Sequence, residues 1–297
     1  MSTNEHPGAR LRALMQHDTV MAPGAFNALV ARAVAQAGFG ACYVSGGAIS
    51  VGAGVPDVGL LTLDFFASIV RQVAQGSGLP VIADADTGFG EEEMVRKTVI
   101  EYNHAGGAGL HIEDQVFPKR CGHLDGKSLQ SVDQMVSRVQ WARKASEDCS
   151  SGDFLICART DAKGVEGFDS AIERAKAYVN AGAHMIFPEG LTSEDEFERF
   201  AGAMDELGDK RPFMLANMTE FGKTPMIGID RFKALGYNIV IYPVSTMRLA
   251  MGAITRALAE LKSEGTLEGQ LGNMQTRDEL YDLVEYTPGT PWEFPAH

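Results

Sequence analysis

The sequence predicts an α/β fold, a (β/α)8 TIM-type barrel, and three observations carry this prediction. Eight short apolar runs of strand length recur along the 297 residues, and helical periodicity fills most of the intervals between them. Eight units of about 30 residues take up about 240 residues, which is the usual size of this barrel. No GxGxxG motif follows the first run, which argues against the main rival, a doubly wound sheet that binds a dinucleotide.

The expected strands and helices follow one another in a regular order. The apolar runs are residues 20–22, 41–44, 80–83, 109–112, 154–158, 184–187, 212–215 and 238–241. Helical periodicity marks 25–36, 64–75, 91–105, 132–146, 169–181 and 194–206. Ala37-Gly38 and Ala181-Gly182 interrupt the pattern just before the next strand, as helix breakers do.

The chain continues beyond the eighth run with more residues than a barrel needs. Two further helices are expected at 246–264 and 275–284, before a proline-rich tail. No low-complexity linker or block of like charge divides the sequence, so we expect one domain over 1–297, with about 246–297 as a C-terminal helical extension. This extension packs either on its own barrel or on a neighbouring subunit.

Composition excludes several classes of function. The 26 Lys and Arg against 39 Asp and Glu give a formal net charge of −13, which repels nucleic acid and anionic lipid, so neither nucleic acid nor a membrane is an expected partner. No apolar stretch reaches the roughly 18 residues of a membrane span, and residues 1–10 have no secretory apolar region. The four cysteines form no CxxC pair, so disulfides are not expected. We expect a soluble cytoplasmic protein, with the mitochondrial matrix left open.

Polar residues follow most of the expected strands, at the end where catalytic groups of such barrels project. Ser45, Gly46 and Gly47 follow the second run, where backbone N–H groups can approach a carboxylate or phosphate, although a plain turn explains the glycines equally well. Tyr43 lies at the end of that run. Asp57 taken alone fits a solvated turn.

Acidic residues gather after the third and fourth runs. Asp84 and Asp86 reach the barrel mouth together, and oxygen ligands at this density suit Mg²⁺ or Mn²⁺, although helix capping explains an isolated DxD as well. His111 and Glu113 end the fourth run. A single strand histidine is more often a core residue, but its alternation with Glu113 beside the aspartate pair favours a metal site.

The segment 119–123, KRCGH, surrounds one thiol with three groups that can carry positive charge. Such surroundings lower the pKa of a thiol and can bind a substrate anion, whereas on an ordinary surface loop the same residues would have no particular function. Arginines beside a metal form a clamp for a polyanion, although each arginine alone fits a surface salt bridge. The candidate residues of later strands and C-terminal helices are Arg159, Glu189, Asn217, Thr219, Arg248 and Arg277.

Over nearly its whole length the sequence resembles the isocitrate lyase and phosphoenolpyruvate mutase superfamily, most closely its methylisocitrate branch. Segment 84–90, DADTGFG, is shared across that superfamily, and 119–123, KRCGH, is specific to its C–C lyases. Segments 217–222, NMTEFG, and 274–277, MQTR, resemble the methylisocitrate branch. Ala48 departs from the family, in which a third glycine commonly extends Ser45-Gly46-Gly47, and we expect only a changed loop detail.

The resemblance implies a Mg²⁺-dependent lyase, with Mn²⁺ as the other candidate metal, that cleaves 2-methylisocitrate to pyruvate and succinate in the methylcitrate cycle of propionate catabolism. It also implies a homotetramer in which C-terminal helices swap between paired subunits. Asp84 and Asp86 would hold the metal, and Asp57, Glu113 and His111 would orient its waters. Ser45, Gly46 and Gly47 would bind the 2-oxo acid end of this small tricarboxylate. The succinate end would meet Cys121, Gly122, Arg159, Glu189, Asn217, Thr219, Arg248 and Arg277.

For the reaction, Cys121 is the expected general acid and Tyr43 a candidate base. Lys119 and His123 would restore the thiol, while Arg159 would stabilise the developing charge. A phenylalanine at Phe187 accompanies a methyl-bearing substrate in the family. We also expect the loop 117–126 to close over substrate.

Three alternatives stay open. Within enzymes, they are a lyase for a related 2-hydroxy diacid such as 2,3-dimethylmalate and an oxaloacetate decarboxylase. Outside enzymes, the chain would be a silent barrel that binds organic acids. The combined supply of Arg248, Arg277, Asn217 and Thr219 favours a tricarboxylate, and the presence of Cys121, Asp84 and Asp86 argues against a silent barrel.

Overall fold

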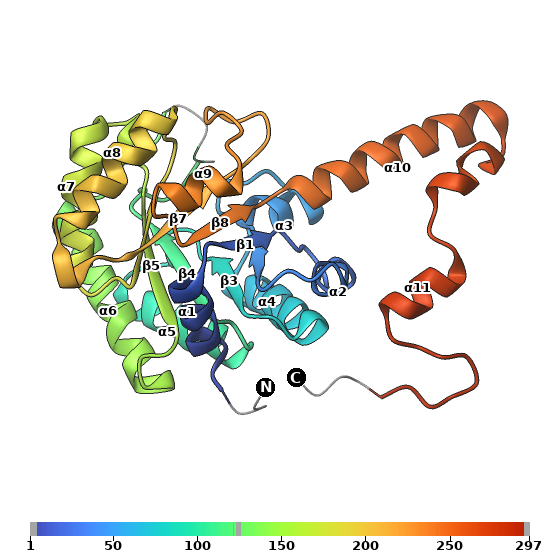
Figure 1. Cartoon of the computed structure of the whole chain (residues 1–297), viewed down its shortest axis with the longest axis horizontal. Coiled ribbons are helices and arrows are strands. Elements are labelled where there is room, and N and C mark those ends of the chain that lie inside the picture. Colours follow the sequence, from blue (N-terminus) through green and yellow to red (C-terminus); the bar gives the residue numbers. More distant parts are fainter. Residues whose placement is uncertain (1–4, 121, 123–125, 294–297) are drawn as a thin grey trace.

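The computed structural model describes residues 5–120, 122 and 126–293, and it forms the predicted (β/α)8 barrel (Figure 1). Strands β1 to β8 are Val20–Pro23, Cys42–Val44, Val81–Asp84, Gly109–Glu113, Leu155–Thr160, Met185–Pro188, Phe213–Asn217 and Ile239–Tyr242. They pair in parallel in the order β1-β8-β7-β6-β5-β4-β3-β2. A parallel bridge between Gly24 and Tyr43 joins β1 to β2 and completes the ring.

Helices surround this barrel. They are α1 Pro7–His17, α2 Ala28–Gln36, α3 Gly46–Gly52, α4 Leu63–Ser77, α5 Glu92–His104, α6 Val132–Ser150, α7 Phe168–Asn180, α8 Glu194–Asp205, α9 Ile229–Ala234, α10 Ser245–Glu264 and α11 Arg277–Leu283. All eight strands were predicted, and so were the helices other than α1, α3 and α9. The segment Ser45-Gly46-Gly47 was expected as a loop, but Ser45 caps α3 and the two glycines form its first turn. A helix of seven residues that begins with two glycines is too short and too poor in apolar side chains to show helical periodicity in the sequence.

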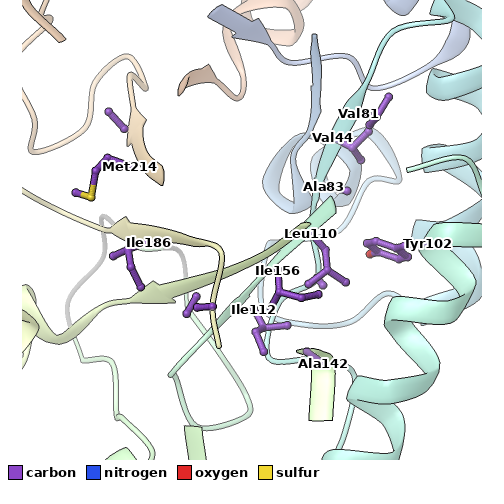
Figure 2. Close-up of a cluster of buried hydrophobic side chains, with 14 of the residues drawn as sticks. Val44, Val81, Ala83, Tyr102, Leu110, Ile112, Ala142, Ile156, Ile186 and Met214 are labelled. Atoms are coloured by element: carbon purple, nitrogen blue, oxygen red, sulfur yellow. The ribbon is translucent and has the colours of Figure 1, made fainter. Parts of the chain in front are cut away.

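Side chains of the strands alternate between two apolar layers because successive residues of a strand point to opposite faces. Leu110, Ile112 and Ile156 face outward, and Figure 2 shows them directed toward Tyr102 of α5 and Ala142 of α6. A second cluster fills the inside of the barrel, with Ile82, Leu155, Cys157, Met185, Leu215, Ile239 and Ile241 among its members. The inward positions nearer the carboxyl ends of the strands are therefore left for polar groups.

Helix α1 covers the amino-terminal end of the barrel. Leu11 and Met15 of α1 belong to the interior cluster. Gly8 approaches the strands so closely that a Cβ there would overlap the Asp153 carbonyl oxygen and lie 2.7 Å from that of Ala108. A polar segment thus packs on the core because one small residue permits a close approach.

Helix α10 leaves the barrel, and the chain returns through α11 (Figure 1). Met247 is the buried residue of α10, whereas Leu249, Ile254 and Leu258 are exposed. Beyond α11, Glu285 pairs with Arg32 of α2 at 3.3 Å. Among the helices that the structure describes, none has the length and apolar character to cross a membrane.

Candidate active site

The polar site lies at the carboxyl ends of the strands, above the apolar filling of the barrel. Inward-facing positions there carry Tyr43 of β2, Asp84 of β3, Glu113 of β4 and Arg159 of β5. Tyr43, Asp84 and Arg159 border a cavity of about 260 Å³, and Glu113 is not among its lining residues. The predicted site residues that line it are Tyr43, Ser45, Gly47, Asp57, Asp84, Lys119, Gly122, Arg159, Glu189, Asn217, Thr219 and Arg248.

Other predicted residues lie behind the cavity wall or elsewhere. The Gly46 backbone N–H donates to Asp84 Oδ2 at 3.1 Å, and the Asp86 N–H donates to Asp84 Oδ1 at 3.0 Å. Arg277 begins α11 and is not part of the cavity lining within one chain. Cys121 and His123 lie outside the described residues, as does part of the loop that was expected to close.

Lys119 stands among the predicted metal ligands. Its Nζ forms an ion pair with Asp57 and lies 2.7 Å from Asp86 Oδ1, and its side chain is 3% exposed. Burial acts to lower the pKa of Lys119, but the surrounding carboxylates, Asp86 first, raise it well above its ordinary value. Lys119 is therefore a buried cation directed at the acidic cluster.

Burial and mutual repulsion disturb the acids themselves. Burial raises the pKa of Glu113 well above its ordinary value. Burial also raises the pKa of Asp86 to about 6, and the charge of Asp84 adds to this. For Asp84 burial acts in the same direction, but interactions with His111 and with the cations Lys119 and Arg159 lower its pKa overall. The cluster thus holds more carboxylates than its one ammonium can neutralise.

This donor set fits a hard divalent cation. No described residue donates a hydrogen bond to either carboxylate oxygen of Glu113, although Arg159 Nε lies 3.3 Å from Oε2. Among the residues that the structure describes, no three His, Cys, Asp or Glu side chains are already grouped as metal ligands. Mg²⁺ usually takes one or two carboxylates and completes its shell with waters and substrate oxygens. The carboxylates around Lys119 supply oxygen ligands of the kind that Mg²⁺ prefers.

Tyr43 and His111 form a buried hydrogen-bonded pair, with 2.8 Å between the hydroxyl and Nε2. Burial lowers the pKa of His111 to about 4 and raises that of Tyr43 well above its ordinary value, so both are neutral near pH 7. A proton on His111 Nδ1, which lies 3.6 Å from Asp84 Oδ1, would leave Nε2 to accept a hydrogen bond from the Tyr43 hydroxyl. The hydrogen bond with His111 fixes the position of the Tyr43 hydroxyl at the cavity, and the base role considered for Tyr43 stays a prediction.

Arg159 is oriented by three acids. Its Nε lies 3.0 Å from Asp161 Oδ2 and 3.3 Å from Glu113 Oε2, and its NH2 lies 3.5 Å from Glu189 Oε2. Its guanidinium carbon is 5.1 Å from the ring centroid of Phe187. Gly122 packs directly against this group, since a Cβ at Gly122 would lie 2.6 Å from Glu189 Cγ and overlap Arg159 NH2. A side chain at Gly122 would therefore force Arg159 or Glu189 to shift.

The rim of the cavity contains Glu220 and Phe221, two residues that the sequence analysis did not assign to the site. Arg248 stands beside them, with Nε 3.8 Å from Glu220 Oε2 and its guanidinium carbon 5.1 Å from the Phe221 ring. Phe221 is 92% exposed. Both belong to the segment 217–222, and their place in that motif was the available signal.

Asp161 was also missed as a site residue, although it orients Arg159. It comes two residues after Arg159 at the end of β5, and strand alternation could have placed both side chains on one face. Burial acts to raise the pKa of Asp161, but the charges of Arg159 and Lys127 lower it to about 2. Asp161 is therefore a permanent anion beneath the cavity.

Known proteins share this fold and sequence. The family model of phosphoenolpyruvate phosphomutase matches residues 11–262. A probable 2-methylisocitrate lyase of Corynebacterium glutamicum is 53% identical over 264 residues, 89% of this chain and 84% of that protein. The 2-methylisocitrate lyase of Aeropyrum pernix is 48% identical over 283 residues, 95% of this chain and 88% of that protein.

A solved structure agrees with these matches. The crystal structure of 2,3-dimethylmalate lyase, described as a member of the PEP mutase/isocitrate lyase superfamily, has a TM-score of 0.85 at 34% identity and covers 94% of this chain and 91% of its own. The motifs DADTGFG and KRCGH had indicated the same relationship. The chain therefore belongs to the phosphoenolpyruvate mutase and isocitrate lyase superfamily.

Proposed function

We propose that this protein is a carbon–carbon lyase that cleaves 2-methylisocitrate into pyruvate and succinate. The observation that carries the proposal is the cavity at the carboxyl ends of the strands, where the aspartates stand at one side and Arg159 and Arg248 supply fixed cations. A tricarboxylate needs both a metal chelate and cationic groups. The two relatives compared above, which carry this activity in their names, support the same substrate.

The charge balance of the cavity supports a metal cofactor. Among its described lining residues, Asp57, Asp84, Glu189 and Glu220 are acids, whereas Lys119, Arg159 and Arg248 are cations. An anionic substrate would meet net negative charge without a further cation. In this proposal Asp84 and Asp86 hold Mg²⁺, and Asp57, Glu113 and His111 lie around it. When bound, Mg²⁺ supplies Lewis acidity to the hydroxyl and carboxylate oxygens of the substrate.

The chain's own groups then serve the two ends of the bond that breaks. The hydroxyl-bearing carbon becomes the keto carbon of pyruvate as its hydroxyl proton passes to a base, for which Tyr43 is the candidate. The adjacent carbon keeps the electron pair of the broken bond and takes up a proton, which completes succinate. In this assignment Ser45, Gly46 and Gly47 bind the pyruvate end, and Arg159 and Asn217 stabilise the charge that develops on the succinate end.

The remaining assignments concern proton transfer and the rim. Cys121 is assigned as the acid that protonates the succinate carbon, and Lys119 and His123 are assigned to restore its thiol afterwards. Lys119 is assigned to hold the acidic cluster in place between turnovers, a role that rests on its contacts with Asp57 and Asp86. Gly122, Glu189, Thr219 and Arg248 are assigned to substrate binding, on the ground that they line the cavity.

One assay tests the function directly. The purified protein is supplied with Mg²⁺ and, in parallel, 2-methylisocitrate, isocitrate, 2,3-dimethylmalate or oxaloacetate, and formation of the product 2-oxo acid (glyoxylate from isocitrate, pyruvate from the others) is followed. We expect fastest release from 2-methylisocitrate, loss of activity with a chelator and recovery on adding Mg²⁺. Faster turnover of 2,3-dimethylmalate or oxaloacetate would replace the proposal with that alternative, and no turnover of any would favour the silent barrel.

We further propose that the chain is one domain whose extension 246–297 contributes to a homotetramer. The exposed apolar side chains of α10 support this, as does an apolar groove of about 500 Å³ beside β1 and β8, lined by Met21, Val30, Val34 and Tyr242 among others. Exposed apolar surface of this extent is typical of protein interfaces. A helix from a second copy would cover the groove and the face of α10 together, and Arg277 would reach a partner's site rather than its own.

A further inference from the structure

We propose that Lys127 is a positioning residue for the reaction. Its buried ammonium fixes the position of Gly122 directly and that of Arg159 through Asp161. The inference rests on the proposed lyase function and adds a residue to which none of the sequence motifs assigned a role. Lys127 lies outside the cavity lining, so it acts through the groups that it contacts.

The contacts of Lys127 are short and enclosed. Its Nζ donates to the Gly122 carbonyl oxygen and to Asp161 Oδ1, the latter at 2.8 Å. Its side chain is 5% exposed, and that of Asp161 is fully buried. A buried ion pair seldom stabilises a fold more than apolar packing would, so stability alone is a weak explanation for it.

Asp161 connects Lys127 to Arg159. It accepts from Arg159 Nε at 3.0 Å and from NH2 at 3.3 Å, which fixes the plane of the guanidinium. Behind it, the Asp161 backbone N–H donates to Asp114 Oδ1 at 2.9 Å, and Thr160 Oγ1 donates to Asp114 Oδ2 at 2.7 Å. Asp161 is therefore anchored by Asp114 on one side and balanced by Lys127 on the other.

Gly122 is the second group that Lys127 contacts. It packs against Arg159 and Glu189 so closely that a side chain at this position would force one of them to shift. Because Lys127 holds the carbonyl of Gly122 and the carboxylate that orients Arg159, one ammonium sets the distance between the loop and the end of β5. Without it, Asp161 would attract Arg159 alone, and Gly122 would lose its tie to the barrel.

A cavity beside Lys127 makes the idea testable by chemical rescue. This cavity has a volume of about 230 Å³ and is lined by Lys127, Gly122, Gly126 and Gly164 among others. In Lys127→Ala, a small alkylammonium ion such as ethylammonium can enter this space and replace the missing charge. Lys127→Arg keeps a cation, and Lys127→Met keeps the length without one.

Kinetics are measured well below the unfolding temperature and expressed per folded protein, with 2-methylisocitrate as substrate. We expect Lys127→Ala and Lys127→Met to lose about 10²-fold in kcat/KM, mostly in kcat, because misplacing a catalytic group by about 1 Å costs this much. Ethylammonium should restore at least tenfold to Lys127→Ala and nothing to the wild type, and Lys127→Arg should retain more activity than Lys127→Met. The matched control is Lys163→Met, which removes another partly buried pair, Lys163 Nζ to Glu196 Oε1 at 2.9 Å, and should leave kcat/KM unchanged.

Two results would overturn the inference. One is a Lys127→Ala protein that keeps kcat/KM within twofold of the wild type. The other is a crystal structure of Lys127→Ala in which Gly122 and Arg159 stay where they are in the wild type. The crystal structure separates this failure from failure of the proposed function, since it reports the two positions even if the wild type cleaves none of the substrates.

Discussion

His184 is a histidine at the amino-terminal end of β6 that the fold holds neutral. Its Nδ1 accepts from the Ile156 N–H at 3.0 Å, and Arg143 contacts Nε2. Burial first, then the charges of Arg143 and Arg12, lower its pKa to about 3. The unfolded chain, with a histidine pKa near 6.5, therefore binds one more proton than the folded chain between pH 6.5 and 3.

This difference predicts a pH dependence of stability. Above about pH 6.5 the contribution of neutral His184 is complete, and it is lost as pH falls toward 3, at about 1.4 kcal/mol per pH unit. His184→Asn keeps an acceptor for the Ile156 N–H but cannot take up a proton. Urea unfolding at pH 7, 6 and 5 should show a shallower fall in the free energy of unfolding for His184→Asn. Equal slopes for the two proteins would contradict the assignment.

A substitution of Arg159, a single residue, is expected to change activity. Arg159→Lys keeps one positive charge but loses the planar fork that faces Glu113, Asp161 and Glu189. We expect kcat/KM for 2-methylisocitrate to fall about 10²- to 10³-fold, the usual effect of losing one transition-state donor. Arg199→Lys is the control, because the Arg199 guanidinium also stands over a phenylalanine ring, 4.6 Å from the centroid of Phe168, but Arg199 does not line the cavity. A fall of less than threefold at Arg159 would contradict its role.

At the scale of elements, two helical glycines predict opposite effects. Gly8 of α1 faces the Asp153 and Ala108 carbonyl oxygens, whereas a Cβ at Gly202 of α8 would have open space. Gly8→Ala should lower the free energy of unfolding by about 1–3 kcal/mol through overpacking. Gly202→Ala should raise it by about 0.5–1 kcal/mol, since it restricts the unfolded chain without new contacts. Chemical denaturation measures both, and effects of the same sign would show that α1 is not packed as described.

The whole molecule combines an acidic exterior with exposed apolar surface on α10. The net charge of −13 argues against polymeric anions as partners, but Arg159, Arg248 and Lys119 place cations among the acids of the cavity, and the proposed metal would add the further positive charge. A small carboxylate can therefore enter a protein that would repel nucleic acid. The exposed apolar side chains of α10 bear on the proposed association with copies of the same chain.

The prediction at this scale is an association state. Leu258 of α10 is 60% exposed, and Leu60, before α4, is 58% exposed. In sedimentation velocity we expect a tetramer for the wild type, smaller species for Leu258→Glu, and an unchanged tetramer for the control Leu60→Glu, because only Leu258 lies on the proposed interface. A wild-type protein that sediments as a monomer would contradict the homotetramer.

The sequence by itself determined the order of strands and helices and most of the residues around the cavity. Strand periodicity depends on near neighbours, so Asp84, Glu113 and Arg159 could be assigned to inward positions at strand ends without a structure. The barrel then brings those ends together whatever the loops do.

Only the tertiary structure decided which charges meet. Lys119 contacts Asp57 and Asp86, and Lys127 joins Gly122 to Asp161, through approaches that depend on loop paths and on packing between distant segments. Helix α3 at Ser45-Gly46-Gly47 escaped prediction because glycine carries no periodic signal. Arg277 lies away from the cavity of its own chain because its helix follows α10 off the barrel, so its place depends on what α10 packs against.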